Sequence, residues 1–267
     1  MITPLELVKR TPKTNCGECG YPTCLAFAAL AVKGVASLER CPHLDRAGLS
    51  LPQPTMVEEA QLHQAKDLQL IEHLKAKIAP LDFGAIAASL GADWQPAEPD
   101  CLRFRYLGQA VTLARSGILL DGREPEDPRD QILLYNYLHS GGGAAPAGDW
   151  VGLESLPNSI SKVRTLATYC ENRLAGQCAS LPLPAIMAAA ERLGGVHQPQ
   201  AAASLGCIIP VLPRVPHYLL YWQAEPEDGF PARVKVLFDR KVLDYLDLES
   251  LVFSAERMAD ALVANLP

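Results

Sequence analysis

Four cysteines near the start of the chain, Cys16, Cys19, Cys24 and Cys41, constrain what the first fifty residues can fold into. Two residues separate the first pair, four the second and sixteen the third. In a chain without an export signal, thiolates at this density are typical of a metal centre rather than of disulfide cross-links. The sequence therefore predicts that these four side chains share one inorganic group.

The spacing favours iron over zinc. A cubane iron–sulfur cluster usually takes three thiolates from one tight loop and the fourth from a distant position that proline often follows, as Pro42 does here. Structural zinc sites more often have two C-x2-C knuckles or histidine ligands, and only one knuckle is present. Gly17 and Gly20 directly follow two of the cysteines, where the backbone has to bend at positive φ. The pattern predicts one 4Fe-4S cluster.

The chain between Cys24 and Cys41 has to reverse direction for the four thiolates to meet. Residues 25–33 are rich in alanine and leucine and predict a short helix, which Gly34 would end. An unbroken helix would hold the two cysteines about 25 Å apart, whereas the chain from Gly34 to Cys41 spans up to about 23 Å when extended. A helix followed by a return leg is therefore expected.

A wider set of residues surrounds these cysteines in a specific order. The set is the run PKTNCGECG over residues 12–20, then Pro22, Cys24, Ala26, Phe27, Ala28, Gly34 and Cys41-Pro42. In this pattern residues 5–44 resemble the N-terminal 4Fe-4S module of the corrinoid iron–sulfur protein large subunit, and are similar to cluster modules in electron-transport subunits of anaerobic membrane complexes. The resemblance implies ligand roles for Cys16, Cys19, Cys24 and Cys41.

Corrinoid binding is not implied by this resemblance. The corrinoid proteins continue into a (β/α)8 barrel with a corrinoid-binding portion, and this chain has neither eight strand–helix repeats nor the length for both. At 267 residues, with 49% hydrophobic and 20% charged residues, it is expected to form two globular domains of unequal size.

Charge is unevenly distributed along the chain. Residues 1–50 contain six basic and four acidic residues, so their net charge is +2. Since the net charge of the whole chain is −6, the remaining residues carry −8. The acidic balance argues against a nucleic-acid partner. Two interpretations of the positive segment stay open: a surface that docks an acidic redox carrier, and a plain solvated face near an anionic cluster.

No membrane insertion is expected, because the longest apolar runs, such as residues 25–32, are far shorter than the roughly 20 residues that cross a bilayer. The N-terminus has no basic stretch followed by an apolar one. We therefore expect a cytoplasmic protein, since reducing conditions also keep cluster thiolates from oxidation.

The chain is expected to divide into a cluster-binding module at 1–50, a helical linker at 51–80 and an α+β domain at 81–267. Ile2, Leu5 and Val8 would share one face of an opening helix. Pro52 and Pro54 mark the linker, and its helix, over 55–78, has apolar positions near helical spacing. These positions are Met56, Ala60, His63, Leu70, Leu74 and Ile78.

The large domain alternates strand and helix signals. Residues 102–113 predict a hairpin around Gly108, and 217–223 and 233–238 predict strands separated by an acidic turn. Helices are expected over 130–138, 160–174, 184–193 and 248–262, and the glycines at 141–143 end the first of them. The predicted fold class is α+β: a small, mainly helical iron–sulfur module with four cysteine ligands, followed by a larger α+β domain.

Several segments of this domain stand out together: 132–138, 149–151, 210–222, 230–232 and 236–239. They resemble a domain family of unknown function that is often fused to this same cluster module in anaerobic bacteria and archaea. The resemblance spans roughly residues 81–265 and implies one intact domain. It implies no catalytic residue.

Other candidate features favour structural roles. Cys101, Cys170, Cys178 and Cys207 are expected to be buried apolar side chains rather than a second metal site. The histidines His139, His197 and His217 are expected at the surface or hydrogen-bonded in the core. The densest set of functional side chains is Arg214, His217, Tyr218, Tyr221 and Trp222. These side chains could form a binding surface or could pack within the sheet, and packing is favoured because aromatic residues are common in strands for packing reasons alone.

Three functions are compatible with these features. In the first, the protein transfers electrons to a client protein or activates it by reduction. Its partner would be a ferredoxin-like donor or a client acceptor, and the resemblance suggests a corrinoid protein as the client. In the second, the C-terminal domain is a redox enzyme fed by the cluster. In the third, the cluster is structural or sensory in an interaction scaffold. The sequence identifies no catalytic residue and leaves open whether the chain is an enzyme.

Overall fold

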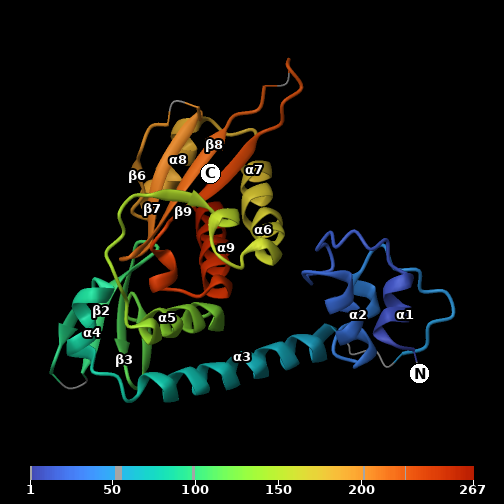
Figure 1. Cartoon of the computed structure of the whole chain (residues 1–267), viewed down its shortest axis with the longest axis horizontal. Helices are drawn as coiled ribbons and strands as arrows, with labels where there is room; N and C mark the ends of the chain where they lie inside the picture. The colour runs from blue at the N-terminus through green and yellow to red at the C-terminus, as the bar shows by residue number, and fades with distance from the viewer. Residues whose placement is uncertain (1, 52–55, 98–99, 201, 226) are drawn as a thin grey trace. The chain divides into compact units, whose positions relative to one another are not determined.

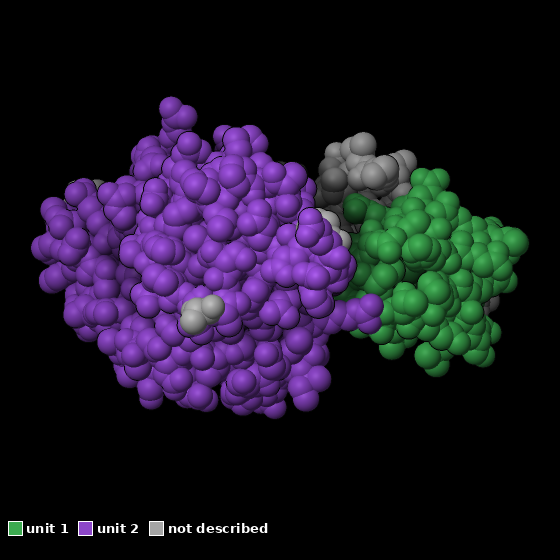
Figure 2. Space-filling model, turned by 90° about the horizontal axis from the view of Figure 1, so that it is seen from above, with its two compact units in different colours: residues 1–69 green, residues 70–267 purple. Residues whose placement is uncertain are grey.

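The computed structural model describes residues 2–51, 56–97, 100–200, 202–225 and 227–267, with the side chains of 56–64 excepted (Figure 1). The chain divides into two compact units, Met1–Gln69 and Leu70–Pro267, which Figure 2 colours separately. Each unit has its own apolar core. The predicted fold class is confirmed, while the division at residues 50 and 80 stays a prediction.

The first unit is helical, and the boundary between the units falls within a long helix. The elements are α1 (Pro4–Lys9), α2 (Cys24–Val32), the 3-10 turn η1 (Leu38–Arg40) and α3 (Met56–Ile78).

The second unit contains two antiparallel sheets and several helices. Its strands are β1 (Asp93–Gln95), β2 (Cys101–Tyr106), β3 (Gln109–Ala114), β4 (Gly117–Leu120), β5 (Trp150–Gly152), β6 (Val196–His197), β7 (Leu205–Leu212), β8 (Val215–Trp222) and β9 (Arg233–Asp239). Its helical elements are α4 (Phe83–Leu90), α5 (Pro128–Ser140), η2 (Leu153–Ser155), α6 (Ile160–Leu166), η3 (Ala167–Glu171), α7 (Asn172–Cys178), α8 (Leu183–Arg192), η4 (Val242–Asp244) and α9 (Leu248–Ala264).

The phase of α1 is set by its N-terminal cap. Thr3 and Glu6 form a capping box, in which each side chain accepts a hydrogen bond from the other residue's backbone N–H. Ile2, before the cap, and Leu7, four residues after it, belong to the same apolar cluster, as in a hydrophobic staple. Of the residues expected to share one face of this helix, Ile2 and Val8 pack against the apolar cluster, whereas Leu5 is 66% exposed and Leu7 is fully buried.

The predicted linker helix exists as α3, and its last turns belong to the second unit. Ile71, Leu74 and Ile78 are buried in that unit's core, at spacings of three and four residues. Leu70, which was expected on this face, is 42% exposed. The other positions predicted for the apolar face of this helix, Met56, Ala60 and His63, lie outside the described side chains, and Pro52 and Pro54 lie outside the described residues. Arg115 caps the end of the helix by donating to the backbone carbonyls that follow it.

The first sheet has the strand order β1-β2-β3-β4, and the predicted hairpin is its β2–β3 pair. Tyr106 pairs with Gln109 across a two-residue turn. Both turn residues have positive φ, 48° at Leu107 and 82° at Gly108, as in the type I′ turns that match strand twist. The Leu107 N–H donates to the Val211 carbonyl at 3.1 Å, so the hairpin end is tied to the second sheet.

The second sheet has the order β5-β9-β8-β7-β6 and is antiparallel throughout. The two predicted strands are confirmed as β8 and β9, whereas β7 was not predicted. The β7–β8 register shifts between Pro210 and Leu212, at a proline that has no N–H to give to the ladder. Figure 1 shows α9 against this sheet, and α9 packs against α5, α6, α7 and α8.

The predicted helices are confirmed with shifted ends. The helix expected over 130–138 is longer, because Asp127 caps its start and Gly141, at a φ of 70°, ends it. The helix expected over 160–174 is divided by the π-helical segment η3 and continues to Cys178. None of the helices in the described part of the chain is both long and apolar enough to span a bilayer.

Replacing Gly108 by alanine should destabilise the second unit through two effects. A non-glycine residue at this φ costs roughly 1–2 kcal/mol, and the new Cβ would lie 2.7 Å from the Arg192 carbonyl oxygen. Gly122 has a similar φ of 80° with nothing within 4 Å of an added Cβ, so Gly122→Ala is the matched control. Denaturant unfolding of the full chain should show a clearly larger loss for Gly108→Ala; equal losses would contradict the steric argument.

Candidate iron–sulfur site

The loop that carries the first three cysteines is bent where the backbone φ is positive. Gly17 has a φ of 81° and Gly20 a φ of 83°, as the sequence predicts. Lys13 and Asn15 also have positive φ, 56° and 50°, a conformation that is unfavourable for residues with a Cβ. Backbone bends of this kind direct N–H groups into a concavity that binds anions. The loop is therefore suited to a negatively charged group.

Asn15 fastens this loop to the helix that follows it. Its Oδ1 accepts a hydrogen bond from the backbone N–H of Cys24 at 2.8 Å. Cys24 is the first residue of α2, and Thr23 caps the helix by accepting from the Ala26 N–H. Since a helix N-terminus carries partial positive charge, a thiolate at Cys24 lies in a favourable position.

The return leg to Cys41 follows the prediction. Gly34 has a φ of 69° directly after the end of α2. The N–H groups of Val35 and Ala36 then donate back to the Leu30 carbonyl, at 2.9 and 3.3 Å. The chain passes through η1 and reaches Cys41 at its end.

Contacts from the residues after Cys41 hold it in place. The Arg46 guanidinium donates to the Cys41 carbonyl at 3.1 Å. The Asp45 N–H donates to the Arg10 carbonyl at 3.0 Å, which joins this segment to the end of α1. Cys41, the fourth predicted ligand, is thus held by the segment that follows it, and this segment is bonded to the end of α1.

Burial and two neighbouring thiols affect the ionisation of Cys19. Burial raises the pKa of Cys19, and the negative charges of Cys41 and Cys16 raise it further. The backbone N–H groups of Tyr21 and of Cys19 itself act in the opposite direction, because they donate to the sulfur. A metal core would compensate the repulsion between these thiolates, so the residues fit a thiolate-ligated cluster.

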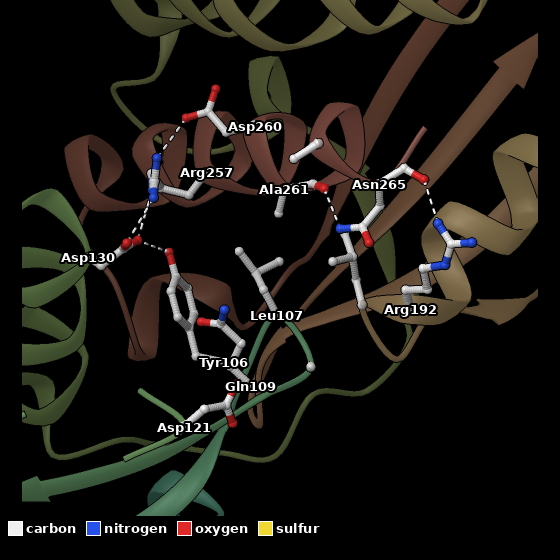
Figure 3. Close-up of a pocket in the computed structure, with 13 residues that line it drawn as sticks. Tyr106, Leu107, Gln109, Asp121, Asp130, Arg192, Arg257, Asp260, Ala261 and Asn265 are labelled. Atoms are coloured by element: carbon white, nitrogen blue, oxygen red, sulfur yellow. Dashed lines mark hydrogen bonds and ion pairs between the residues drawn. The ribbon is translucent and has the colours of Figure 1, made fainter. Parts of the chain in front are cut away.

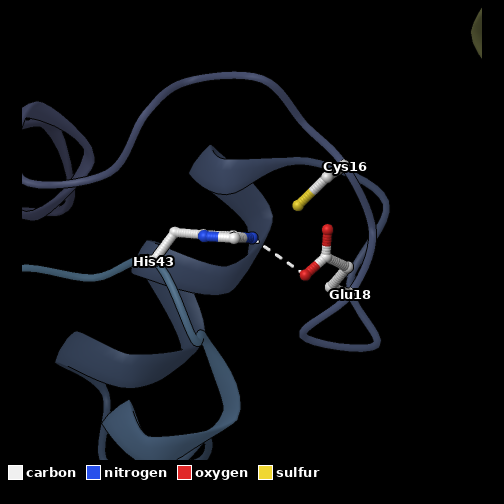
Figure 4. Close-up of side chains that lie close together, drawn as sticks. All are labelled: Cys16, Glu18 and His43. Atoms are coloured by element: carbon white, nitrogen blue, oxygen red, sulfur yellow. Dashed lines mark hydrogen bonds and ion pairs between the residues drawn. The ribbon is translucent and has the colours of Figure 1, made fainter.

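A pair of side chains missed by the sequence analysis lies beside Cys16 (Figure 4). The ligand atoms of Cys16, Glu18 and His43 are all within 4.8 Å of one another. His43 Nε2 and Glu18 Oε2 are 2.8 Å apart, and both side chains are about half exposed. Since the two residues are 25 positions apart, only the return leg brings them together.

The second unit contains a pocket of about 540 Å³ between the β2–β3 turn, α5, α8 and the end of α9 (Figure 3). Asp130 is one of its lining residues and accepts a hydrogen bond from the Tyr106 hydroxyl at 2.7 Å. The Arg257 guanidinium donates to both Asp130 oxygens at 2.8 Å. Burial and the Asp130 charge raise the pKa of Tyr106 well above its usual range, so its hydroxyl remains a donor.

Arg257, one of the two arginines that line this pocket, is paired with carboxylates. Arg257 Nη1 lies 2.8 Å from Asp260 and 3.3 Å from Asp127, in addition to the Asp130 contacts. All three guanidinium nitrogens thus face carboxylates. The network joins β2, α5 and α9, which gives it a structural role in the second unit.

The side chains grouped around His217 in the sequence do not converge on one site. Within β8, His217 is hydrogen-bonded to Ser254 of α9, and the Tyr221 hydroxyl donates to the Cys178 carbonyl. The Tyr218 ring contacts Trp150, and its hydroxyl donates to the Gln198 carbonyl. The remaining two are directed elsewhere: Trp222 donates to Ala202 and Arg214 to Ala88. Both faces of the strand are covered, so the packing interpretation is confirmed.

His217 is fully buried and hydrogen-bonded, as expected for a core histidine. The Ser254 hydroxyl donates to the Leu251 carbonyl at 2.7 Å, so its oxygen accepts from His217 Nε2 at 2.8 Å. The ring packs edge-on against Phe238. Burial lowers the pKa of His217 to about 4. His139 and His197 are exposed.

The four cysteines of the second unit are buried in its apolar core, as predicted. Burial raises the pKa of Cys178 to about 11 and that of Cys207 to about 12, so these thiols are protonated at neutral pH. All eight cysteines of the chain lie in its described part, and each carries a free thiol.

Comparison with known proteins assigns both parts of the chain to families. The model of a domain of unknown function, DUF3786, matches residues 82–261, and the Fe-S cluster model matches residues 12–43. The N-terminal segment is thus of the iron–sulfur type. No solved structure gives a significant match.

Curated relatives match the chain over short stretches. The corrinoid/iron-sulfur protein large subunit of Moorella thermoacetica is 56% identical over 46 residues, which are 17% of this chain and 10% of the relative. The acetyl-CoA decarbonylase/synthase complex subunit gamma 2 of Methanosarcina mazei is 35% identical over 94 residues, 34% of this chain and 17% of the relative. The matched stretch is therefore less than a fifth of either relative's length.

The burial of His217 predicts a pH-dependent stability of the second unit. The pKa of this residue is about 6.5 in the unfolded chain and about 4 in the folded one. At pH values between these two, the unfolded chain binds a proton at His217 and the folded chain does not. The free energy of unfolding should therefore fall by about 2 kcal/mol between pH 7 and pH 4.5 on this account. His217→Gln should remove that part of the pH dependence.

Tryptophan fluorescence during denaturant unfolding measures this effect, since Trp94, Trp150 and Trp222 all lie in the second unit. His139→Gln, at an exposed position on α5, is the control and should keep the wild-type pH dependence. An unchanged pH dependence in His217→Gln would contradict the assignment.

Proposed function

Because the chain belongs to the DUF3786 family of domains of unknown function, we propose its function from the iron–sulfur module that precedes this domain: electron transfer to a client protein through one 4Fe-4S cluster. The observation that carries the proposal is the match of the Fe-S cluster model to residues 12–43, which contain all four cysteines, in a loop bent at positive φ at Gly17 and Gly20. When bound, such a cluster supplies one-electron chemistry, commonly at low potential.

The proposed ligands are Cys16, Cys19, Cys24 and Cys41. The groups that stabilise negative charge on the sulfur differ between them. The N-terminus of α2 offsets negative charge at Cys24. The Tyr21 N–H donates toward the Cys19 sulfur, and hydrogen bonds to cluster sulfurs favour the reduced form because they stabilise the added electron. These contacts support a redox role over a purely structural one.

The proposed client is a corrinoid protein, and the proposed donor is a ferredoxin-like carrier. The support is the similarity to subunits whose names include a corrinoid/iron–sulfur protein and an acetyl-CoA decarbonylase/synthase complex. The His217, Tyr106 and Arg257 side chains of the second unit are engaged within that unit, so the proposal assigns no electron-transfer step to them. Free cluster thiolates require reducing conditions, which supports a cytoplasmic location.

Loss of one proposed ligand should abolish cluster binding. Cys19→Ser removes a buried thiol from the loop, so anaerobically purified protein should lose most of its iron and sulfide and its EPR signal after reduction. Cys178→Ser changes an equally buried thiol in the second unit and should leave the iron content unchanged. Wild-type protein that contains zinc or no metal would contradict the proposal, and iron loss in both variants would mean that the ligand set is incomplete.

A loaded protein should also reduce a corrinoid. After reduction and removal of excess reductant, mixing with cobinamide in the cobalt(II) state should convert one cobalt(II) to cobalt(I) for each cluster oxidised. The loss of the EPR signal of the reduced cluster and the absorbance of cobalt(I) measure the two halves of this exchange. The Cys19→Ser variant is the control and should give no cobalt(I). A loaded, reduced protein that leaves cobalt(II) unchanged would contradict the corrinoid client.

A further inference from the structure

We infer that electrons enter and leave the cluster at the surface formed by Cys16, Glu18 and His43, which we name the Cys16 face (Figure 4). The inference rests on the proposed function, since it assumes that the four cysteines bind a redox-active cluster. It adds where a one-electron carrier makes contact and which side chains it meets there.

The four thiols differ in their access to solvent. Cys19 and Cys24 are each 8% exposed, and Cys41 is 4% exposed. Cys16 is the one member of the set that is not buried. The rate of electron transfer falls steeply with distance, so a carrier in solution exchanges electrons fastest with the edge of a cluster that it can approach most closely. That edge is at Cys16.

Packing within the first unit closes the other approaches. Cys19 and Cys41 belong to the apolar cluster that also contains Tyr21 and Phe27, whose rings are 5.8 Å apart. Cys24 is the first residue of α2 and is covered on its backbone side by Asn15. These three ligands therefore lie behind protein atoms of their own unit.

Glu18 and His43 form the border of the exposed edge. Their side chains are 55% and 45% exposed, and their polar atoms lie within 4.8 Å of each other and of the Cys16 sulfur. A carrier that reaches Cys16 must therefore contact one or both of them. The hydrogen bond of 2.8 Å between His43 Nε2 and Glu18 Oε2 holds the Glu18 carboxylate at this border, so its charge acts on any charged carrier.

The charge of Glu18 offers a direct test with small redox probes. A thiolate-ligated cluster is itself an anion, so absolute rates depend on it, and only the change between variants reports the position of Glu18. Glu18→Lys alters the local charge by two units. For a triply charged probe at a contact distance of about 8 Å, this should change the rate about tenfold at an ionic strength of about 0.1 M, more at lower salt and less at higher salt.

The experiment follows the oxidation of dithionite-reduced full-length protein by stopped flow. Each event moves one electron from the cluster to hexacyanoferrate(III) or to hexaammineruthenium(III), and either oxidant becomes its divalent form. In Glu18→Lys the trianionic oxidant should react about tenfold faster and the tricationic oxidant about tenfold slower. His43→Glu makes the opposite change on the same surface and should shift both rates in the opposite direction.

Glu227→Lys is the matched control, because it makes the same charge change at an exposed turn in the other compact unit. It should leave both rates within about twofold of the wild type, since the inference assigns the charge effect to Glu18 and His43. Iron content and EPR signal are measured for every protein, so that rates are compared between equally loaded clusters. Wild-type protein without a cluster would refute the proposed function itself.

Three results would overturn the inference while the proposed function stands. The first is a loaded Glu18→Lys or His43→Glu protein with unchanged rates. The second is an equal shift in Glu227→Lys. The third is a failure of both Glu18→Lys and His43→Glu to bind iron, because these side chains would then serve cluster assembly rather than electron exchange.

Discussion

Repulsion between thiolates is the constraint on which the first unit depends. The pKa of Cys19 is raised by burial and by its neighbours Cys41 and Cys16, so several negative sulfurs in this place are unfavourable without compensation. The chain supplies part of it through N–H groups and the start of α2. A metal core would supply the rest. Binding and folding are therefore expected to be coupled, as in other small metal-binding modules.

The small size of the first apolar core leads to the same conclusion. Two of its buried members, Cys19 and Cys41, are themselves proposed ligands, and its large side chains are few: Leu7, Tyr21, Phe27, Leu38 and Leu44. Modules near this size commonly need a metal, a disulfide or a partner in addition to apolar burial. All eight cysteines carry free thiols, which leaves the cluster as the cross-link that the sequence itself provides.

The sequence was informative where a local rule decides the structure. Cysteine spacing, Gly34 and Gly108 each act within a few residues, and the loop, the reversal and the hairpin were predicted from them. Contacts between distant segments were not accessible in the same way. Glu18 and His43 meet only because the return leg is in place, and nothing in their local sequence indicates it.

Two further positions show what apolar spacing and a short sequence window leave undecided. Leu5 and Val8 have helical spacing, but the Thr3 cap sets the helix phase so that Leu7 is buried instead. Asp130 lies in the first turn of α5, and Asp127 is the cap of this helix. Asp130 is buried because Arg257, 127 residues later, pairs with it. No window of sequence around Asp130 contains its partner.

The two units differ in how they use charge, and this difference supports a division of labour. In the second unit the buried charges are paired internally: Asp130 with Arg257, and Glu171 with the Val236 N–H and Lys235. Such groups stabilise one arrangement and are costly to rearrange. In the first unit the Glu18–His43 pair is half exposed beside the most accessible thiol, where an ion pair contributes little to stability. A pair of little structural value at the accessible edge of a redox centre is best explained by what approaches that edge.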